Sequence, residues 1–256
     1  MVRAARDPAG DNRRMADRND HRLADDLIAT LTAARGIERD LIGDLPPETR
    51  DAPGANGGWS PKDVQAHLTA WKARQTERLA AARRGETVAP LPEEEIDRVN
   101  AGQYEARAGW SWSDVADEAD RVTEDFAAAL RAIDEDTLTS AEPLLGGSMG
   151  NGASHTLEHV APLARDHGRD GRVLAFAKEL EEIVGRSALP DSDKGVFLYN
   201  QACFHALGGR LDAARGLLPE AFRLRPDLVA FAPQDTDLAE LHGELHRMGG
   251  APPVNP

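Results

Sequence analysis

The stretch GWSPKDVQAHLTAW, residues 58–71, marks the start of a helix on which the fold depends. Ser60 stands where a helix cap accepts a backbone hydrogen bond, and Pro61 suits the first helical turn, where no amide donor is needed. Asp63 places a negative charge at the positive end of the helix. The segment therefore predicts a helix that starts at Pro61.

The continuation of this stretch has the spacing of an amphipathic helix. Its buried face is expected to carry residues three or four positions apart, namely Val64, Leu68, Trp71, Gln75 and Leu79. Trp59 and Val64 stand where a hydrophobic staple would join them. His67 lies beside Val64 and Trp71, so a titratable side chain that can bind metal borders the buried face.

Helical spacing recurs along the chain, and strand-like alternation does not. A first helix has an apolar face of Leu23, Leu27, Leu31, Ala34, Leu41 and Leu45 and is ended by Pro46-Pro47. A third helix repeats the start signal at Ser111 and Asp114 and continues to Ile133. A fourth carries HTLEH, residues 155–159.

The sequence also predicts the connections between these helices. Glycine-rich stretches at 52–58 and 146–154 are predicted to be loops. A crossover rich in proline and glutamate, residues 85–95, separates the second and third helices. The fold class predicted for residues 20–186 is therefore all-α, an up-down four-helix bundle with a long crossover.

The C-terminal part has a different pattern. After a linker at 187–194, residues 195–250 are expected to form a helical hairpin with a closing helix. The small and apolar positions of a tetratricopeptide repeat are matched by Leu198, Ala202, Gly209, Ala214, Leu218, Ala221 and Pro226. Pro219 is expected to kink or end the second helix of the hairpin early. Because one repeat cannot form a solenoid, the segment would pack on the bundle or bind a second copy or another protein.

Composition excludes several functional classes. The 30 basic and 44 acidic residues give a formal net charge of −14, so binding to nucleic acid or an anionic membrane is not expected. No apolar run is long enough to span a bilayer, and the N-terminus has no apolar signal region. Residues 1–19 are expected to be a disordered lead, and Met15 is an alternative start. The single cysteine, Cys203, fits a reducing cytoplasm and a buried position.

Three histidines are candidates for one metal site. His155 and His159 are four residues apart, so they point from the same face of a helix, and His67 could add a third imidazole from a facing helix. Chance pairs of this kind are common; His242 and His246 form another, which we interpret as a solvated helix face. The pattern alone leaves open whether the three are ligands or structural histidines.

A resemblance to a known family favours the metal site. The segments GWSPKDVQAHLTAW, IDRVNAGQYEARAGWSWSDVADEADRVTEDFAAALRAI and SHTLEHVAPL resemble the DinB/YfiT-like superfamily, and within it the ClbS/DfsB-type four-helix-bundle proteins. The resemblance covers roughly residues 22–166. It implies that His67, His155 and His159 hold a divalent ion, namely zinc, nickel or iron. It also implies thiol-dependent transfer, isomerisation or small-molecule detoxification.

The sequence departs from the family pattern in the fourth helix. Pro162 lies three residues after His159 and is expected to strain or kink the helix, which would re-aim the histidine pair. Gly168 and Gly171 are expected to loosen its continuation. Neither change removes a ligand.

The residues HTLEH also fit H-x-x-E-H, a metallopeptidase signature in which Glu158 would be the general base. Such a site needs a further carboxylate ligand, for which Glu179, Glu181 and Glu182 are the downstream candidates. The bundle context argues against this remote alternative.

Three more residues are candidates for a substrate pocket. Asn100 and Tyr104 belong to the crossover that covers one end of such bundles, and Trp71 could wall the metal site. Each also has a purely structural interpretation, in which Trp71 packs in the core and the other two hold the crossover in place.

Two hypotheses of function follow. In the first, the bundle is a metal-dependent enzyme that activates water or a low-molecular-weight thiol against an electrophilic small molecule. In the second, it is a non-catalytic binding or sequestering module whose C-terminal segment recruits a partner through Tyr199, His205 and Arg210.

Overall fold

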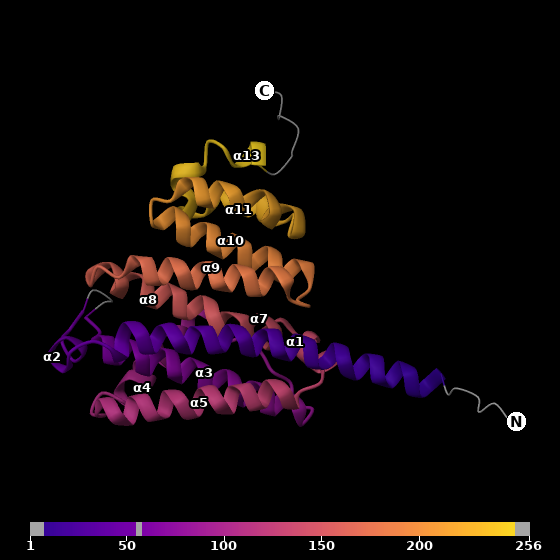
Figure 1. Ribbon diagram of the computed structural model, residues 1–256, viewed down its shortest axis with the longest axis horizontal. Coiled ribbons are helices and arrows are strands. Elements are labelled where there is room, and N and C mark those ends of the chain that lie inside the picture. The colour runs from indigo at the N-terminus through magenta and orange to yellow at the C-terminus, as the bar shows by residue number, and fades with distance from the viewer. Residues whose placement is uncertain (1–7, 55–57, 249–256) are drawn as a thin grey trace, which may run out of the picture. The chain divides into compact units, whose positions relative to one another are not determined.

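The computed structural model describes residues 8–54 and 58–248, and this part of the chain is helical without strands (Figure 1). The predicted all-α class is confirmed. The chain divides into two compact units, Met1–Phe176 and Ala177–Pro256, which are described separately below. None of the described helices combines the length and hydropathy needed to cross a bilayer.

The first helix is longer than predicted. α1 runs Pro8–Glu38 and continues as a π-helical turn, η1 (Arg39–Gly43), before the short α2 (Pro47–Arg50). Proline at the first position of α1 is favourable, and no other proline interrupts the helix. Residues 1–7 of the expected lead lie outside the described residues. The apolar face predicted for the first helix is buried as expected, at all six of its positions: Leu23, Leu27, Leu31, Ala34, Leu41 and Leu45.

The second helix begins where the sequence predicts. α3 runs Pro61–Arg83, and Ser60 Oγ accepts a hydrogen bond from the Asp63 amide at 3.1 Å. The Asp63 carboxylate accepts the Ser60 amide in return at 3.0 Å, which completes a capping box. Trp59 packs against a cluster that contains Val64, so the expected staple is present.

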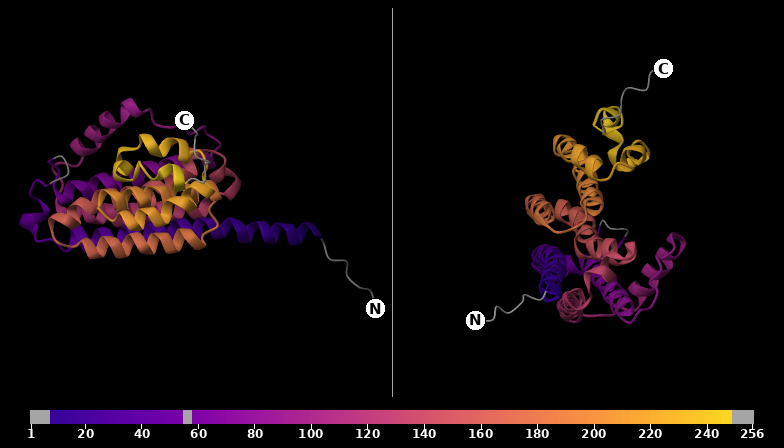
Figure 2. Two further views of the ribbon diagram at one scale, coloured as in Figure 1. Left: turned by 90° about the horizontal axis from the view of Figure 1, so that it is seen from above. Right: turned by 90° about the vertical axis from the view of Figure 1, so that its right-hand side faces the viewer.

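A crossover helix, α4 (Glu93–Glu105), follows and packs on the outer side of α3, and none of its residues is fully buried (Figure 2). α5 (Trp112–Ala132) then returns beside α3 and α1. Ser111 and Asp114 repeat the capping box. The buried stripe of α5 consists of Val115, Ala119, Val122, Phe126 and Leu130.

The glycine-rich stretch at 146–154 is not a loop, so that prediction was wrong. After α6 (Glu135–Thr139), the stretch forms the end of α7 (Glu142–Met149) and a π-helical turn, η2 (Gly150–Ser154). Helix packing explains one of the glycines. A Cβ atom added at Gly147 would lie 2.7 Å from Gln75 Oε1, so any other residue here would require the Gln75 amide to move.

The last bundle helix, α8 (His155–Asp166), continues past Pro162. Proline removes one amide donor, and the helix tolerates this loss here. The chain leaves the helix at Gly168, whose φ of 63° lies in the left-handed region, and α9 (Asp170–Arg186) follows. The boundary between the two units falls within α9.

The C-terminal unit contains the predicted hairpin. α10 (Asp191–Leu207) begins inside the expected linker and packs against α11 (Leu211–Leu224), as Figure 1 shows. Pro219 was predicted to kink the second helix or to end it early; α11 runs through Pro219 to Leu224, so the helix does not end early. The closing helix is broken into the short pieces α12 (Leu228–Phe231), η3 (Ala232–Gln234), η4 (Thr236–Leu241) and α13 (Leu245–Met248).

Small side chains allow close packing in this hairpin. A Cβ atom at Gly195 would lie 2.6 Å from the Cβ atom of Arg225, which leaves room only for hydrogen. Cys203 is buried in the core of the hairpin, and burial raises the pKa of its thiol. The structure thus supports the hairpin, whereas the tetratricopeptide assignment remains a prediction.

Candidate metal centre

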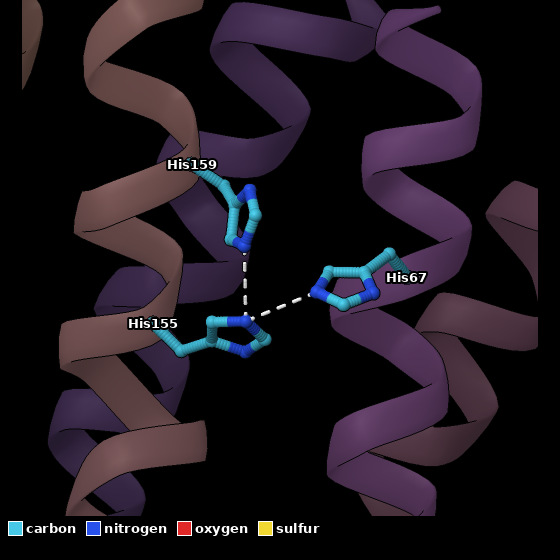
Figure 3. A group of neighbouring side chains, drawn as sticks. All are labelled: His67, His155 and His159. Atoms are coloured by element: carbon cyan, nitrogen blue, oxygen red, sulfur yellow. Dashed lines mark hydrogen bonds between the residues drawn. The ribbon is translucent and has the colours of Figure 1, made fainter. Parts of the chain in front are cut away.

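The three predicted histidines come together inside the N-terminal unit. His67 projects from α3, and His155 and His159 project from successive turns of α8 (Figure 3). His155 Nε2 lies 3.1 Å from His67 Nε2 and 3.0 Å from His159 Nε2. The three imidazoles can therefore offer nitrogen atoms to a single ion.

The spacing of these atoms fits a divalent metal. Two imidazole nitrogens bound tetrahedrally at about 2.0–2.1 Å from zinc would be about 3.3 Å apart, close to the separations seen here. Among the described residues, the ligand atoms within 4.8 Å of one another at this place come from histidine alone. Imidazole suits zinc, iron and nickel, and three such ligands leave coordination positions open.

Burial also prepares the imidazoles for metal binding. His67 is only 7% exposed, and burial together with the charge of His159 lowers its pKa to about 3. Burial, followed by the charges of His159, His67 and Lys72, holds the pKa of His155 well below its ordinary value. Burial lowers the pKa of His159 as well. The three side chains are therefore neutral near pH 7, which is the form that binds a metal ion.

Local helix geometry sets the positions of the pair on α8. His155 is the first residue of α8 and directly follows the π-helical turn η2. A four-residue separation places His159 one turn further on the same face. Pro162 leaves this arrangement intact, because the helix continues beyond it.

Aromatic side chains enclose the histidines. The ring of Trp59 lies 4.8 Å from that of His67, and Trp59 stacks on Tyr104 with ring planes only 2° apart. Trp71 meets His155 edge-on at 6.2 Å between ring centres. Its indole Nε1–H donates a hydrogen bond to Asn100 Oδ1 at 3.0 Å. The crossover helix is thereby joined to the wall of the site.

A small pocket lies between α3 and α4 beside His67. Its lining comprises Trp59, Asp63, Ala66, His67, Asn100, Gln103, Tyr104 and Arg107. Asn100 and Tyr104 are thus placed at a pocket, whereas Trp71 lies outside its lining. The sequence reading missed Gln103 and Arg107. Gln103 could have been found because it follows Asn100 by one helical turn.

A buried ion pair lies next to the histidines and was also missed. Lys72 Nζ and Thr156 Oγ1 both donate to Glu38 Oε1, the latter at 2.8 Å. Gln65 Nε2 donates to the other carboxylate oxygen at 3.0 Å. Burial alone would raise the pKa of Glu38, but the charge of Lys72, the hydrogen bonds from Gln65 and Lys72 and the charge of Arg35 hold this pKa below its ordinary value. The carboxylate is therefore ionised inside the protein.

The peptidase alternative gains no support from this geometry. The side chain of Glu158 is exposed, and no carboxylate among the described residues belongs to the histidine cluster.

Helix packing and convergent neutral imidazoles together define a helical-bundle protein that could hold a divalent metal. The sequence model of the DinB superfamily matches residues 30–169, more than half of the chain, and the protein belongs to that superfamily. No curated protein and no solved structure matches the chain.

Proposed function

We propose that this protein is a metal-dependent enzyme of the DinB superfamily, with His67, His155 and His159 as the metal ligands. The proposal rests on one observation: three neutral imidazoles from two helices bring their Nε2 atoms close together. Zinc, nickel or iron would suit this all-nitrogen ligand set.

A divalent ion held by three imidazoles supplies Lewis acidity, which polarises an electrophile or favours the deprotonated form of a water or thiol. The chain's own residues provide the setting for this chemistry. The buried imidazoles stay unprotonated, so they need not lose protons before binding. Trp59 and Trp71 cover two sides of the site and limit the access of water.

The proposed substrate is an electrophilic small molecule, and the proposed reaction is hydrolysis or transfer of a low-molecular-weight thiol. Such a reaction would serve detoxification or self-protection in the cytoplasm. Asn100 and Tyr104 are proposed to contact the substrate, since both line the pocket beside His67.

Elemental analysis of tag-free protein tests the proposal. The wild type should contain, or take up, about one equivalent of zinc, nickel or iron, and the His155→Ala/His159→Ala variant should contain none. A folded wild type that binds none of the three metals would rule out this function.

A second candidate is a non-catalytic module that binds a partner, and one observation favours it. Leu207 and Phe231 in the C-terminal unit are 63% and 53% exposed, so two large apolar side chains of this unit are available to a partner. The expected groove is not supported: Tyr199 is buried and donates to Asp235, while Arg210 donates to His205 at 3.1 Å.

Sedimentation velocity of the full chain tests self-association through this surface. A dimer in the wild type that becomes a monomer on Leu207→Glu substitution would support the second candidate. A wild-type monomer at high micromolar concentration would argue against a homodimer.

A further inference from the structure

Arg74 differs from the other basic residues of α3. Lys62, Lys72 and Arg78 each donate a hydrogen bond to an oxygen atom elsewhere in the fold, and Arg83 is exposed. Arg74 is partly buried, yet no hydrogen-bond or ion-pair partner is found for it among the described residues. Its positive charge therefore has no anionic partner among the described residues.

This state has an energetic cost. Arg74 Nε is buried without a hydrogen-bond acceptor, whereas the two terminal nitrogens remain accessible. A guanidinium group cannot lose its charge at neutral pH, so it cannot relieve the cost by deprotonation as a lysine could. A buried polar group without a partner is destabilising, and more so when it is charged. An anion bound from solution would offset this cost.

Helix geometry places Arg74 on the side of α3 that faces the histidines. Seven residues separate it from His67, which corresponds to nearly two complete turns and about 10 Å along the axis. Trp71, which contacts the His155 ring, lies between them on the same stripe. Long side chains in a helix lean toward its N-terminus, and Trp71 and His67 lie in that direction from Arg74.

We propose that Arg74 binds an anionic group of the substrate, of the carboxylate type, while the electrophilic centre of the same molecule meets the three histidines. The inference rests on the proposed function and narrows its substrate class. The substrate would be a small molecule that carries both an electrophilic centre and an oxyanion. The planar guanidinium fork matches a carboxylate through two parallel hydrogen bonds. A lysine at this position would provide charge without that geometry.

The test uses the full chain loaded with Co²⁺, whose visible spectrum reports both metal binding and changes in its ligands. Two matched series of probes are titrated: the monohydroxamates of succinic, glutaric and adipic acids, and the neutral alkyl hydroxamates of equal chain length. In the wild type, at least one carboxylate probe should bind tenfold or more tightly than its neutral match. That preference should weaken as the salt concentration rises.

Variants assign the preference to Arg74. Arg74→Gln should remove the preference and leave binding of the neutral probes unchanged, and Arg74→Lys should retain only part of it. Arg83→Gln, which removes an exposed charge from the same helix, is the control and should behave like wild type. If Arg74→Gln does not fold, the comparison of Arg74→Lys with wild type decides.

The outcomes separate the two proposals. A normal cobalt spectrum with no carboxylate preference, or a preference that persists in Arg74→Gln, overturns the role of Arg74 and leaves the metal site standing. A wild type that binds no cobalt, zinc, nickel or iron overturns the proposed function and this inference with it.

Discussion

Lys72 and Glu38 form an ion pair in the interior of the N-terminal unit, with 2% and 0% of their side chains exposed. Lys72 comes from α3 and Glu38 from the end of α1, and Thr156 of α8 donates to the same carboxylate. Three helices are therefore joined at one charged group. One of the joining residues, Thr156, directly follows His155 in the sequence.

Removing one member of this pair should be strongly destabilising, because the remaining charge would be buried without a partner. Glu38→Gln is expected to lower the free energy of unfolding by about 3–5 kcal/mol, measured by urea denaturation. The control Glu124→Gln, at an exposed position of α5, should change it by less than about 0.5 kcal/mol. The double variant Glu38→Leu/Lys72→Met should be more stable than Glu38→Gln alone. Equal stability of Glu38→Gln and wild type would contradict the structural role of the pair.

Gly147 should not tolerate a methyl group. Gln75 Nε2 donates to Pro143 O, Leu144 O and Ser148 Oγ, and a Cβ atom at Gly147 would displace this buried amide. Gly147→Ala is therefore expected to cost about 1–3 kcal/mol of unfolding free energy.

The matched control for this substitution is Gly150→Ala, three residues further along the same helical stretch. Nothing lies within 4 Å of an added Cβ atom at Gly150, so this variant should be neutral or up to about 1 kcal/mol more stable. Equal effects of the two substitutions in thermal melts would show that the close approach of Gly147 to Gln75 is not what requires glycine.

The metal-free protein should lose stability as the pH falls below about 6.5. Burial lowers the pKa of His67 to about 3, whereas the unfolded chain binds a proton near the ordinary histidine value. Between these two pH values the unfolded state carries more protons, so the free energy of unfolding decreases as the pH falls, by at most about 1.4 kcal/mol per pH unit for each such histidine.

Urea titrations between pH 7 and 5 check this expectation above the range in which carboxylates titrate. His67→Gln should show a shallower dependence of unfolding free energy on pH than wild type. A slope that is unchanged in the variant would mean that His67 does not stay neutral in the folded protein.

Metal binding should stabilise the folded state through the same three side chains. Zinc at one hundred times its dissociation constant is expected to add about 2.7 kcal/mol to the unfolding free energy. Differential scanning calorimetry should show a higher melting temperature with zinc for the wild type and no shift for His67→Ala. An equal shift in both proteins would place the bound zinc elsewhere in the chain.

Much of this fold follows from local sequence signals. Ser60 with Asp63, and Ser111 with Asp114, start their helices where predicted, because a capping box depends only on residues three positions apart. The i, i+4 spacing of His155 and His159 likewise places both on one face without any tertiary information. Helix periodicity further identified the buried face of α1.

Local signals failed where a distant residue decides the outcome. Glycines at 146–154 favour a loop when considered alone. In the structure, Gly147 instead lies in a helix, where the amide of Gln75, seventy-two positions earlier, occupies the space that a side chain would take. Pro162 is expected to strain or kink its helix, and Pro219 to kink its helix or end it early. Both α8 and α11 continue as helices through these prolines, because tertiary packing can outweigh the loss of one hydrogen bond.

The sequence by itself determined the helical class, the starts of α3 and α5 and the identity of three candidate ligands. Only the tertiary structure decided that those ligands meet at 3.0 and 3.1 Å and that Lys72 has Glu38 as its counter-ion. It also decided that Arg74 has no counter-ion within residues 8–54 and 58–248. The physical reason is that caps and helix faces depend on neighbours within a turn or two. Distances between ligands, and the pairing of buried charges, depend on how separate helices pack.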